Sequence, residues 1–221
     1  MIVTIDGPAG AGKSSVARQL ARRLGFQFLD TGAMYRAVAF SAIENKIELS
    51  DAQALAAHAA SVHIQLDGNK TFLNGTDVSD AIRTPDVTRA IRFVADHPKI
   101  RRQMVELQRQ IANGRDYVSE GRDQGTVAFP DAACKIFLTA SPAERARRRQ
   151  KDLLDRGQVA KFEEVLADQE QRDRQDRNRP VGALRQAADA VEVNTDGMTP
   201  EQVVDRLEQI VRTRLAELRQ P

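Results

Sequence analysis

Residues 2–14 read Ile-Val-Thr-Ile-Asp-Gly-Pro-Ala-Gly-Ala-Gly-Lys-Ser, and this segment indicates the class of fold. Its β-branched opening predicts a short strand that ends in a glycine-rich turn. From Gly7 to Ser14 the turn matches the pattern G-x-x-x-x-G-K-[ST] in full. Apolar residues then recur at every fourth position from Val16 to Leu24, which predicts a helix. A strand, this turn and a helix in sequence predict a phosphate-binding loop (P-loop) in an α/β domain.

The residue types of the loop suit a phosphate group. Glycines let successive backbone N–H groups turn inward around an anion, and the N-terminus of the next helix adds partial positive charge. We expect Lys13 to bridge the outer phosphates of a nucleoside triphosphate and the Ser14 hydroxyl to bind Mg²⁺. The predicted nucleotide-binding residues are Gly7, Pro8, Ala9, Gly10, Ala11, Gly12, Lys13, Ser14 and Ser15.

The rest of the chain alternates strands with helices around a middle of different pattern. Predicted strands cover 26–29, 117–119, 135–138 and 191–193, and predicted helices cover 33–43, 52–60, 85–95 and 98–113. The alternation predicts a parallel sheet with crossover helices. In the middle, 62–66 and 71–73 flank Asp67-Gly68, which predicts a β-hairpin. We therefore expect a core domain over 1–60 and 100–221 with a subdomain inserted over 60–100.

Two later helices carry signals at their starts. Ser141-Pro-Ala-Glu144 and Thr199-Pro-Glu-Gln202 each combine an N-cap hydroxyl with proline at the first helical position. Each also has Glu or Gln three residues after the cap, which predicts a capping box. The apolar stripe expected on the last helix consists of Val203, Leu207, Ile210, Leu215 and Leu218.

Composition excludes several classes of protein. With 221 residues, 41% hydrophobic and 29% charged, the chain can bury a core and is neither disordered nor a membrane protein. Its net charge is only +2, so it provides no large field for nucleic acid. Cys134 is the single cysteine, which precludes an internal disulfide. Because no signal peptide is recognisable at the start either, we expect a cytoplasmic protein.

Charged clusters follow two of the predicted strands. Asp30–Arg36 comes after the second strand and Glu120–Asp123 after the third, at the sheet edge where open α/β folds bind ligands. A third cluster, Arg172–Arg179, is expected to follow a helix. A GTPase is disfavoured because Asn45-Lys46 is not followed by the Asp of the guanine motif. A small phosphotransferase with a lid accounts for the pattern best.

These motifs together resemble the bacterial-type cytidylate kinases, P-loop nucleoside monophosphate kinases that transfer a phosphoryl group from ATP to CMP. The resemblance extends over nearly the whole chain, and the segments that carry it are 5–13, 29–36, 121–131, 135–138 and 172–179. It implies a P-loop NTPase-type parallel sheet flanked by helices. It also implies a small α+β monophosphate-binding subdomain over 60–100 and a helical lid over 145–158.

The resemblance assigns the nucleoside of CMP to four residues. Arg101 and Asp123 match the readers of cytosine, and the chemistry agrees. A carboxylate can accept from the exocyclic amine, and a guanidinium can donate to the ring acceptors. Arg172 and Asp176 match residues near the ribose.

The resemblance also places residues around the phosphates. Thr31, Arg36 and Arg122 match positions that hold the CMP side, and Arg179 matches a phosphate-contacting arginine. Lys13, Arg36, Arg122 and Arg179 are therefore the expected catalytic residues. No general base is expected, because the second pKa of a phosphomonoester lies near 6. His58, His63 and His97 are instead expected to be packing or surface residues.

Three positions depart from some relatives. Thr31 stands where many have Ser, Glu120 stands where some have Asp near Mg²⁺, and Arg92 replaces a small hydroxyl residue that helps to read the base. The predicted lid carries Arg147, Arg148, Arg149 and Lys151, which are expected to close onto triphosphate charge.

Two alternatives remain open from the sequence. One is a P-loop kinase for another small acceptor, such as UMP, shikimate or gluconate, which would need no reader for a base amine. The other is an RNA-binding protein, which the near-neutral charge and an aromatic content of 5% disfavour. The expected partners are ATP and CMP or dCMP, with no nucleic acid or membrane, and the expected state is a monomer.

Overall fold

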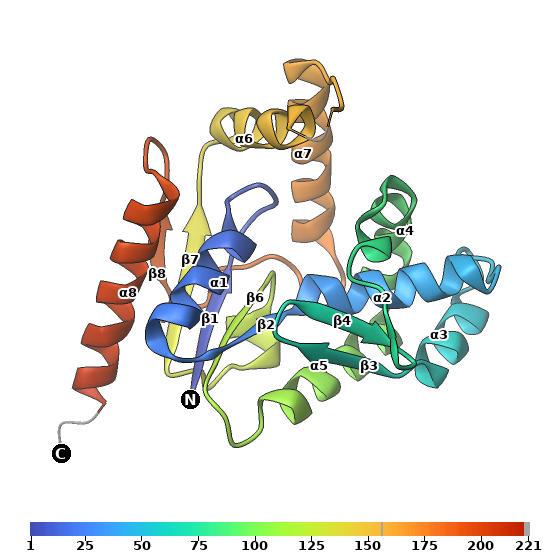
Figure 1. Ribbon diagram of the computed structural model, residues 1–221, viewed down its shortest axis with the longest axis horizontal. Helices are drawn as coiled ribbons and strands as arrows, with labels where there is room; N and C mark the ends of the chain where they lie inside the picture. The colour runs from blue at the N-terminus through green and yellow to red at the C-terminus, as the bar shows by residue number, and fades with distance from the viewer. Residues whose placement is uncertain (156, 219–221) are drawn as a thin grey trace. The chain divides into compact units, whose positions relative to one another are not determined.

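The computed structural model describes residues 1–155 and 157–218, and the chain divides into two compact units (Figure 1). One unit comprises Met1–Phe28 with Gly114–Pro221, and the other comprises Leu29–Asn113. Residue 156 of the predicted lid and residues 219–221 of the predicted core lie outside the described residues. The predicted insertion over 60–100 falls within the second unit, and its assignment as a subdomain stays a prediction.

The elements alternate along the chain much as predicted. The strands are β1 (Ile2–Asp6), β2 (Gln27–Asp30), β3 (Ile64–Asp67), β4 (Lys70–Leu73), β5 (Thr76–Asp77), β6 (Tyr117–Gly121), β7 (Cys134–Thr139) and β8 (Val191–Asn194). The helices are α1 (Lys13–Leu24), α2 (Thr31–Glu44), α3 (Ala52–Ser61), α4 (Pro85–Ala95), α5 (Pro98–Ala112), α6 (Pro142–Leu154), α7 (Phe162–Asn178) and α8 (Pro200–Glu217), with short turns η1 (Ala81–Arg83) and η2 (Gln124–Ala128).

A five-stranded sheet in the order β2-β6-β1-β7-β8 organises the first unit. β1 pairs in parallel with β6 and β7, and β7 pairs in parallel with β8. The predicted parallel sheet with crossover helices is thereby confirmed. Asp6 at the end of β1 lies opposite Gly121 at the end of β6. The P-loop and the segment Arg122-Asp123 therefore leave the sheet at the same edge.

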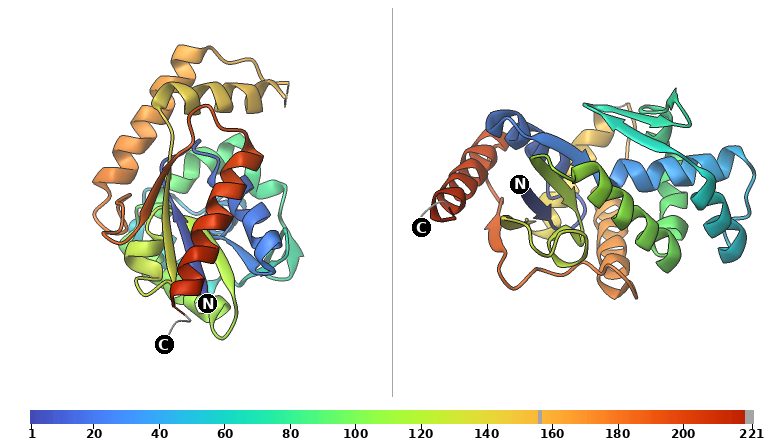
Figure 2. Two further views of the ribbon diagram at one scale, coloured as in Figure 1. Left: turned by 90° about the vertical axis from the view of Figure 1, so that its left-hand side faces the viewer. Right: turned by 90° about the horizontal axis from the view of Figure 1, so that it is seen from below.

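One apolar core joins this sheet to α1 and α8. The two helices lie side by side (Figures 1 and 2), and their buried faces meet the strands. Ile5, Leu20, Ile136, Leu138 and Leu207 are fully buried there. Cys134 is buried in the same core.

The second unit packs helices α2 to α5 with a small antiparallel sheet in the order β3-β4-β5. Its fully buried side chains include Met34, Leu55, Ile82, Ile100 and Met104. The predicted hairpin is confirmed as β3 paired with β4. β5 was not predicted, because a strand of two residues is too short to show an alternating pattern.

Two predictions about helix ends need correction. Ser141 caps α6 by accepting from the Glu144 N–H, but the Ser141 N–H donates to Asp196 at 2.8 Å, so the reciprocal half of the box is not formed. The box at Thr199 is complete. Leu218 is 57% exposed, because α8 ends at Glu217 and the buried stripe stops short of it.

The cluster Arg172–Arg179 was predicted to follow a helix, and this is wrong. Residues 172–178 form the last part of α7. Arg172 and Asp176 are oppositely charged residues four positions apart, as are Asp173 and Arg177, and this spacing favours a helix. Among the described residues, no helix has the length and apolar character needed to cross a bilayer.

Candidate active site

The P-loop follows β1 directly and has a backbone that requires glycine at two places. A Cβ on Gly7 would lie 2.0 Å from the carbonyl oxygen of Leu138 on β7. Gly10 has a φ of +78°, in the left-handed region that favours glycine. Gly12 is the N-cap of α1, and within the described part of the chain no side chain caps that first turn. The turn therefore offers its N–H groups and the positive end of its dipole to an anion.

Lys13 begins α1 and lies folded over the loop. Its Nζ donates to the carbonyl oxygen of Pro8 at 2.8 Å. Burial lowers the pKa of Lys13 to about 7, Arg122 adds to this effect, and Glu120 opposes it. An anionic phosphate beside the amine would favour its charged form. A bound anion would thus give the Lys13 amine a charged partner.

Ser14 and Glu120 place two side-chain oxygens next to the loop. The Ser14 hydroxyl donates to Glu120 Oε1 at 2.7 Å, and Glu120 is buried in β6. A hydroxyl and a carboxylate are ligand types that Mg²⁺ accepts. Residues 1–155 and 157–218 contain no group of three or more His, Cys, Asp and Glu able to hold a metal. A divalent ion here would therefore take its other ligands from water and substrate oxygens, which is usual for Mg²⁺.

Asp6, at the end of β1, holds the turn that follows β6. Its carboxylate accepts the N–H groups of Gln124 at 2.8 Å and Gly125 at 2.7 Å. Both belong to η2, a π-helical turn directly after Asp123. Burial raises the pKa of Asp6 to about 6, although the two N–H groups oppose this. Asp6 thereby anchors the backbone that carries Arg122 and Asp123.

Asp176 on α7 joins two of the predicted phosphate-binding arginines. It accepts from Arg122 Nε at 2.8 Å and from an Arg179 guanidinium nitrogen at 2.6 Å. The exposed fractions of these side chains are 8% for Asp176, 19% for Arg122 and 6% for Arg179. Burial by itself would raise the pKa of Asp176, but the two guanidinium groups outweigh it and lower the pKa to about 2. Three predicted substrate residues therefore meet at one point.

Two other predicted substrate residues of this unit are related to that cluster, Asp123 through its position in the sequence and Arg172 through its charge. Asp123 is buried immediately after Arg122. Arg172 lies on α7, and its positive charge lowers the pKa values of both Lys13 and Asp176. The charges of the loop, of α7 and of the turn after β6 thus act on one another.

Acid should remove the stabilisation that Asp176 provides. Because its pKa is lower in the folded chain than in the unfolded one, the ionised carboxylate stabilises the fold above about pH 4, and this contribution disappears as the pH falls toward about 2. Asp176→Asn should therefore lower the free energy of unfolding at pH 7 by on the order of 2 kcal/mol, with the difference from wild type shrinking in acid. Urea unfolding of both proteins across this pH range measures the effect.

The matched control is Asp168→Asn, which changes an exposed carboxylate on the same helix. We expect it to leave the free energy of unfolding nearly unchanged. A penalty for Asp176→Asn that stayed constant from neutral pH into acid would contradict the assignment of a low pKa to Asp176.

In the second unit, Thr31 and Arg36 lie on α2. Thr31 is the first residue of the helix and is buried, directly after the N-cap Asp30. Arg36 donates to the hydroxyl of Thr88 at 2.9 Å and to the carbonyl oxygen of Ile82 at 3.3 Å. Contacts from α4 and η1 thus orient the Arg36 guanidinium.

Arg101 lies on α5 and is 3% exposed. It donates to the carbonyl oxygen of Ala95 at 2.9 Å, and its guanidinium carbon lies 5.3 Å from the centre of the Tyr35 ring. Arg92, the departure noted in the sequence, lies over the ring of Phe93 at 4.8 Å. Both guanidinium groups are therefore held against aromatic rings, an arrangement that favours the cation.

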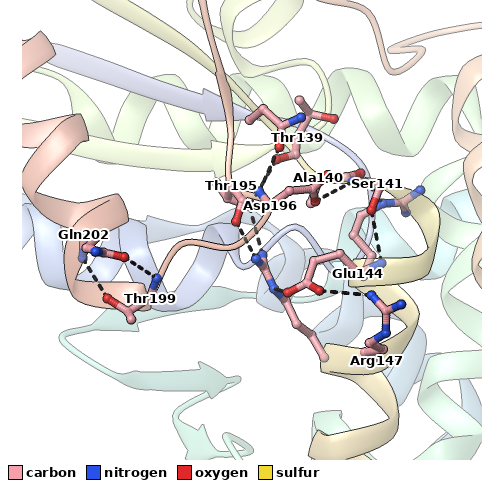
Figure 3. A network of polar contacts seen from close by, with 12 residues as sticks. Thr139, Ala140, Ser141, Glu144, Arg147, Thr195, Asp196, Thr199 and Gln202 are labelled. Carbon is pink, nitrogen blue, oxygen red and sulfur yellow. Dashed lines mark hydrogen bonds and ion pairs between the residues drawn. The ribbon is translucent and has the colours of Figure 1, made fainter.

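Arg148 ties α6 to the loop after β8. Figure 3 shows the surrounding polar network, with Glu144 on α6 near Thr195. It donates to Glu144 at 3.0 Å, to the Thr195 hydroxyl at 2.9 Å and to the Thr195 carbonyl oxygen at 2.7 Å. The Thr195 hydroxyl in turn donates to the Thr139 carbonyl oxygen at 3.1 Å. Arg147 is exposed by comparison and lies 3.5 Å from Glu144. Within the predicted lid, Arg148 is thus anchored to the sheet.

Three residues next to the site were not predicted as site residues. Arg145, grouped with the lid in the sequence, pairs instead with Asp173, and both contact the P-loop. Asp173 and Asp176 lie three residues apart, so a helical assignment of this segment would have placed them on one face. Asp6 carries no such signal, since the N–H groups that it accepts are 118 and 119 residues away.

Comparison with known proteins shows similarity over nearly the whole chain. The family model for cytidylate kinase matches residues 3–213. The cytidylate kinase of Rhodopirellula baltica is 55% identical over 212 residues, which cover 96% of this chain and 93% of the relative. That of Caldanaerobacter subterraneus subsp. tengcongensis is 44% identical over 210 residues, which cover 95% and 94%.

A solved shikimate kinase from Bacteroides thetaiotaomicron has a TM-score of 0.50 and 14% identity, with 96% of this chain and 98% of that chain covered. This likeness concerns the fold alone. The family match and the similarity to the two relatives, by contrast, extend over nearly the full length of each chain. The chain belongs to the cytidylate kinase family.

Proposed function

We propose that this chain transfers the γ-phosphoryl group of ATP to CMP, and to dCMP, producing ADP with CDP or dCDP. The observation that carries the proposal is the buried cluster of Arg122, Asp176 and Arg179 at the sheet edge of the P-loop. A cradle for one polyphosphate and a pair of arginines for a second anion are what a phosphoryl transfer between nucleotides requires. Family membership supports cytosine as the base.

The donor side is built from the P-loop. The first turn of α1 and Lys13 would bind the phosphates of ATP, and Lys13 would exchange its contact with the Pro8 carbonyl oxygen for a phosphate oxygen. Gly7 keeps the backbone close to β7, so the loop has no room to shift toward the strand. Ser14 and Glu120 would hold Mg²⁺, which supplies charge neutralisation on the phosphates when bound.

The acceptor side is held by arginines. Arg122 and Arg179 would bind phosphate oxygens, and Asp176 keeps both guanidinium groups oriented. In the second unit, Thr31 and Arg36 are the proposed contacts to the CMP phosphate. Each guanidinium offers a planar fork that matches phosphate oxygens, which a lysine does not.

The chemical barrier is electrostatic and geometric rather than one of proton removal. A CMP phosphate oxygen is already mostly ionised at pH 7, so it attacks without a general base. Two of the three histidines are engaged elsewhere, since His58 shares a hydrogen bond with Ser41 and His97 caps α5, and His63 is exposed. The work of the site is to bring two anions into line and to neutralise the charge that develops on the transferred group.

Recognition of the nucleoside uses four proposed residues. The Asp123 carboxylate would accept from the cytosine amine, and Arg101 would donate to the ring acceptors. Arg172 and Asp176 are proposed near the ribose. The proposed lid over 145–158 would exclude water during transfer, so that ATP is not hydrolysed. The proposed 60–100 subdomain, the monomeric state and the cytoplasmic location remain predictions from the sequence.

A panel of acceptors tests the function directly. With ATP and Mg²⁺, we expect kcat/KM for CMP and dCMP to exceed that for UMP by at least about tenfold, since uracil presents a carbonyl where cytosine presents an amine donor. AMP and shikimate should give no turnover above background. The measurement is ADP release followed by a coupled assay, and preferential conversion of UMP or shikimate would refute the proposal.

The matched variant for this panel is Asp123→Asn. An amide offers both an acceptor and a donor, so the variant should lose much of its preference for CMP over UMP. Unchanged discrimination in this variant would remove Asp123 from the cytosine contact while leaving the reaction itself in place.

A further inference from the structure

Arg145 and Asp173 form a buried ion pair that the scheme above does not use. The Arg145 guanidinium lies 2.7 Å from the Asp173 carboxylate, and the side chains are 3% and 4% exposed. Arg145 belongs to the start of α6, and Asp173 lies on α7 three residues before Asp176. A buried pair is costly to desolvate, and removing one partner strands a charge. A buried ion pair at this position is therefore expected to have a specific role.

Both partners bind the same residue of the P-loop. Arg145 Nη1 donates to the carbonyl oxygen of Ala9 at 2.9 Å, and the Ala9 N–H donates to the Asp173 carboxylate at 3.3 Å. Arg145 Nε also donates to the carbonyl oxygen of Ala140, just after β7, at 3.1 Å. The N–H and the carbonyl of Ala9 are therefore both engaged by the pair.

The next residue of the loop packs tightly against the same two helices. A Cβ on Gly10 would lie 2.6 Å from Gln169 Nε2 and 3.3 Å from the Arg145 carbonyl oxygen. Gln169, on α7, itself donates to that carbonyl oxygen at 3.2 Å. The hydrogen bonds to Ala9 and the close approach at Gly10 thus act on adjacent residues and restrict the same part of the loop.

We propose that the Arg145–Asp173 pair positions the P-loop, by holding Ala9 and Gly10 in the conformation that receives a triphosphate. The proposal rests on the proposed function only for the identity of that ligand. Both side chains hydrogen-bond to the backbone of Ala9, so the role proposed for them is exerted through the loop. The role is one of positioning, and its signature is an affinity for polyphosphate that depends on the shape of the guanidinium as well as on its charge.

Arg145→Lys separates shape from charge. Lysine keeps a positive charge beside Asp173, but its single nitrogen cannot reproduce the planar fork that reaches Asp173, Ala9 and Ala140. We expect the melting temperature to stay within about 3 °C of wild type, while the Kd for ATP and for inorganic tripolyphosphate rises at least about tenfold. The Kd for CMP should stay within about twofold. Calorimetric titration of each ligand and a thermal melt provide the measurements.

Two further variants complete the test. Arg145→Met strands Asp173 and should lower both the melting temperature and the affinity for ATP. Arg23→Met is the matched control, because Arg23 pairs with Asp205 and Glu208 at the other end of α1. We expect this control to leave the Kd for ATP within about twofold.

Wild-type affinity for ATP and tripolyphosphate in Arg145→Lys would overturn the positioning role. So would an affinity that merely followed the melting temperature across all three variants. Wild-type protein that bound tripolyphosphate but left CMP unphosphorylated would instead overturn the proposed function, and the Kd values of the variants would still decide whether the pair positions the loop.

Discussion

Replacing Arg122 with alanine is expected to lower the turnover of CMP at saturating ATP at least about a hundredfold, and Arg179→Ala should do the same, which corresponds to about 3 kcal/mol of transition-state stabilisation for each residue. Both guanidinium groups are bonded to Asp176 and are largely shielded from water. Charge–charge attraction is stronger in such surroundings than in bulk water, so an arginine here stabilises developing phosphoryl charge strongly. Steady-state assays of ADP release measure both variants.

Each variant needs a check of folding, because the alanine leaves Asp176 with one partner fewer. Circular dichroism and a thermal melt establish that the variant is folded at the assay temperature. Arg174→Ala is the matched control, since Arg174 is exposed on α7 and lies two residues from Asp176. We expect this control to retain turnover within about twofold. Losses below about tenfold in both Arg122→Ala and Arg179→Ala would show that these residues are not the phosphate clamp.

The second large effect is expected at Lys13. Lys13→Ala should lower kcat/KM for ATP by at least about a thousandfold, or on the order of 4 kcal/mol. Lys13 is 5% exposed at the start of α1, where the loop and the helix terminus converge. Burial lowers its pKa to about 7, so part of the amine is neutral before the nucleotide binds. A bound triphosphate would favour the ammonium and gain a charge-assisted hydrogen bond.

The pH dependence adds a second measurement at the same residue. In wild-type protein, ATP binding near pH 7 should take up a proton at Lys13, and Lys13→Ala should remove that part of the uptake. Titration calorimetry in two buffers of different ionisation enthalpy reports the protons exchanged. Lys161→Ala, which changes an exposed lysine of the same unit, serves as the control. Unchanged ATP affinity in Lys13→Ala would exclude the loop as the triphosphate site.

Much of the fold follows from local patterns in the chain. The P-loop motif, the helical spacing from Val16 to Leu24 and the strand–helix alternation predicted the parallel sheet, and the structure confirms it. The Thr199 capping box was also predictable, because all of its bonds lie within four consecutive residues. The capping box predicted at Ser141 is only half formed, because the Ser141 N–H donates to Asp196, which is 55 residues away. Sequence motifs thus predict a hydrogen bond correctly where both of its partners lie within a few residues of each other.

For the site as well, the sequence predicted some features and missed those that depend on distant partners. The family resemblance assigned Arg122, Asp176 and Arg179 to the acceptor, but it did not indicate that Asp176 would bind both arginines. Nor did the sequence place Arg145 against the P-loop; its position near the start of an arginine-rich helix suggested a lid residue. The charged cluster over 172–179 was expected to follow a helix, whereas residues 172–178 belong to α7. Only the packing of α7 against α6 shows which of those charges turn inward.

The P-loop motif and the alternation of strands and helices were therefore predictable from the sequence alone, since glycine spacing and apolar periodicity act over a few residues. The order of the strands in the sheet came only from the structure. Which carboxylate meets which cation was decided only by the tertiary structure. Arg122 and Asp176 are 54 residues apart, and Ala9 and Asp173 are 164 apart. A buried charge is stabilised only by a partner within hydrogen-bonding distance in the folded chain. Short sequence patterns do not predict which distant residue that partner is.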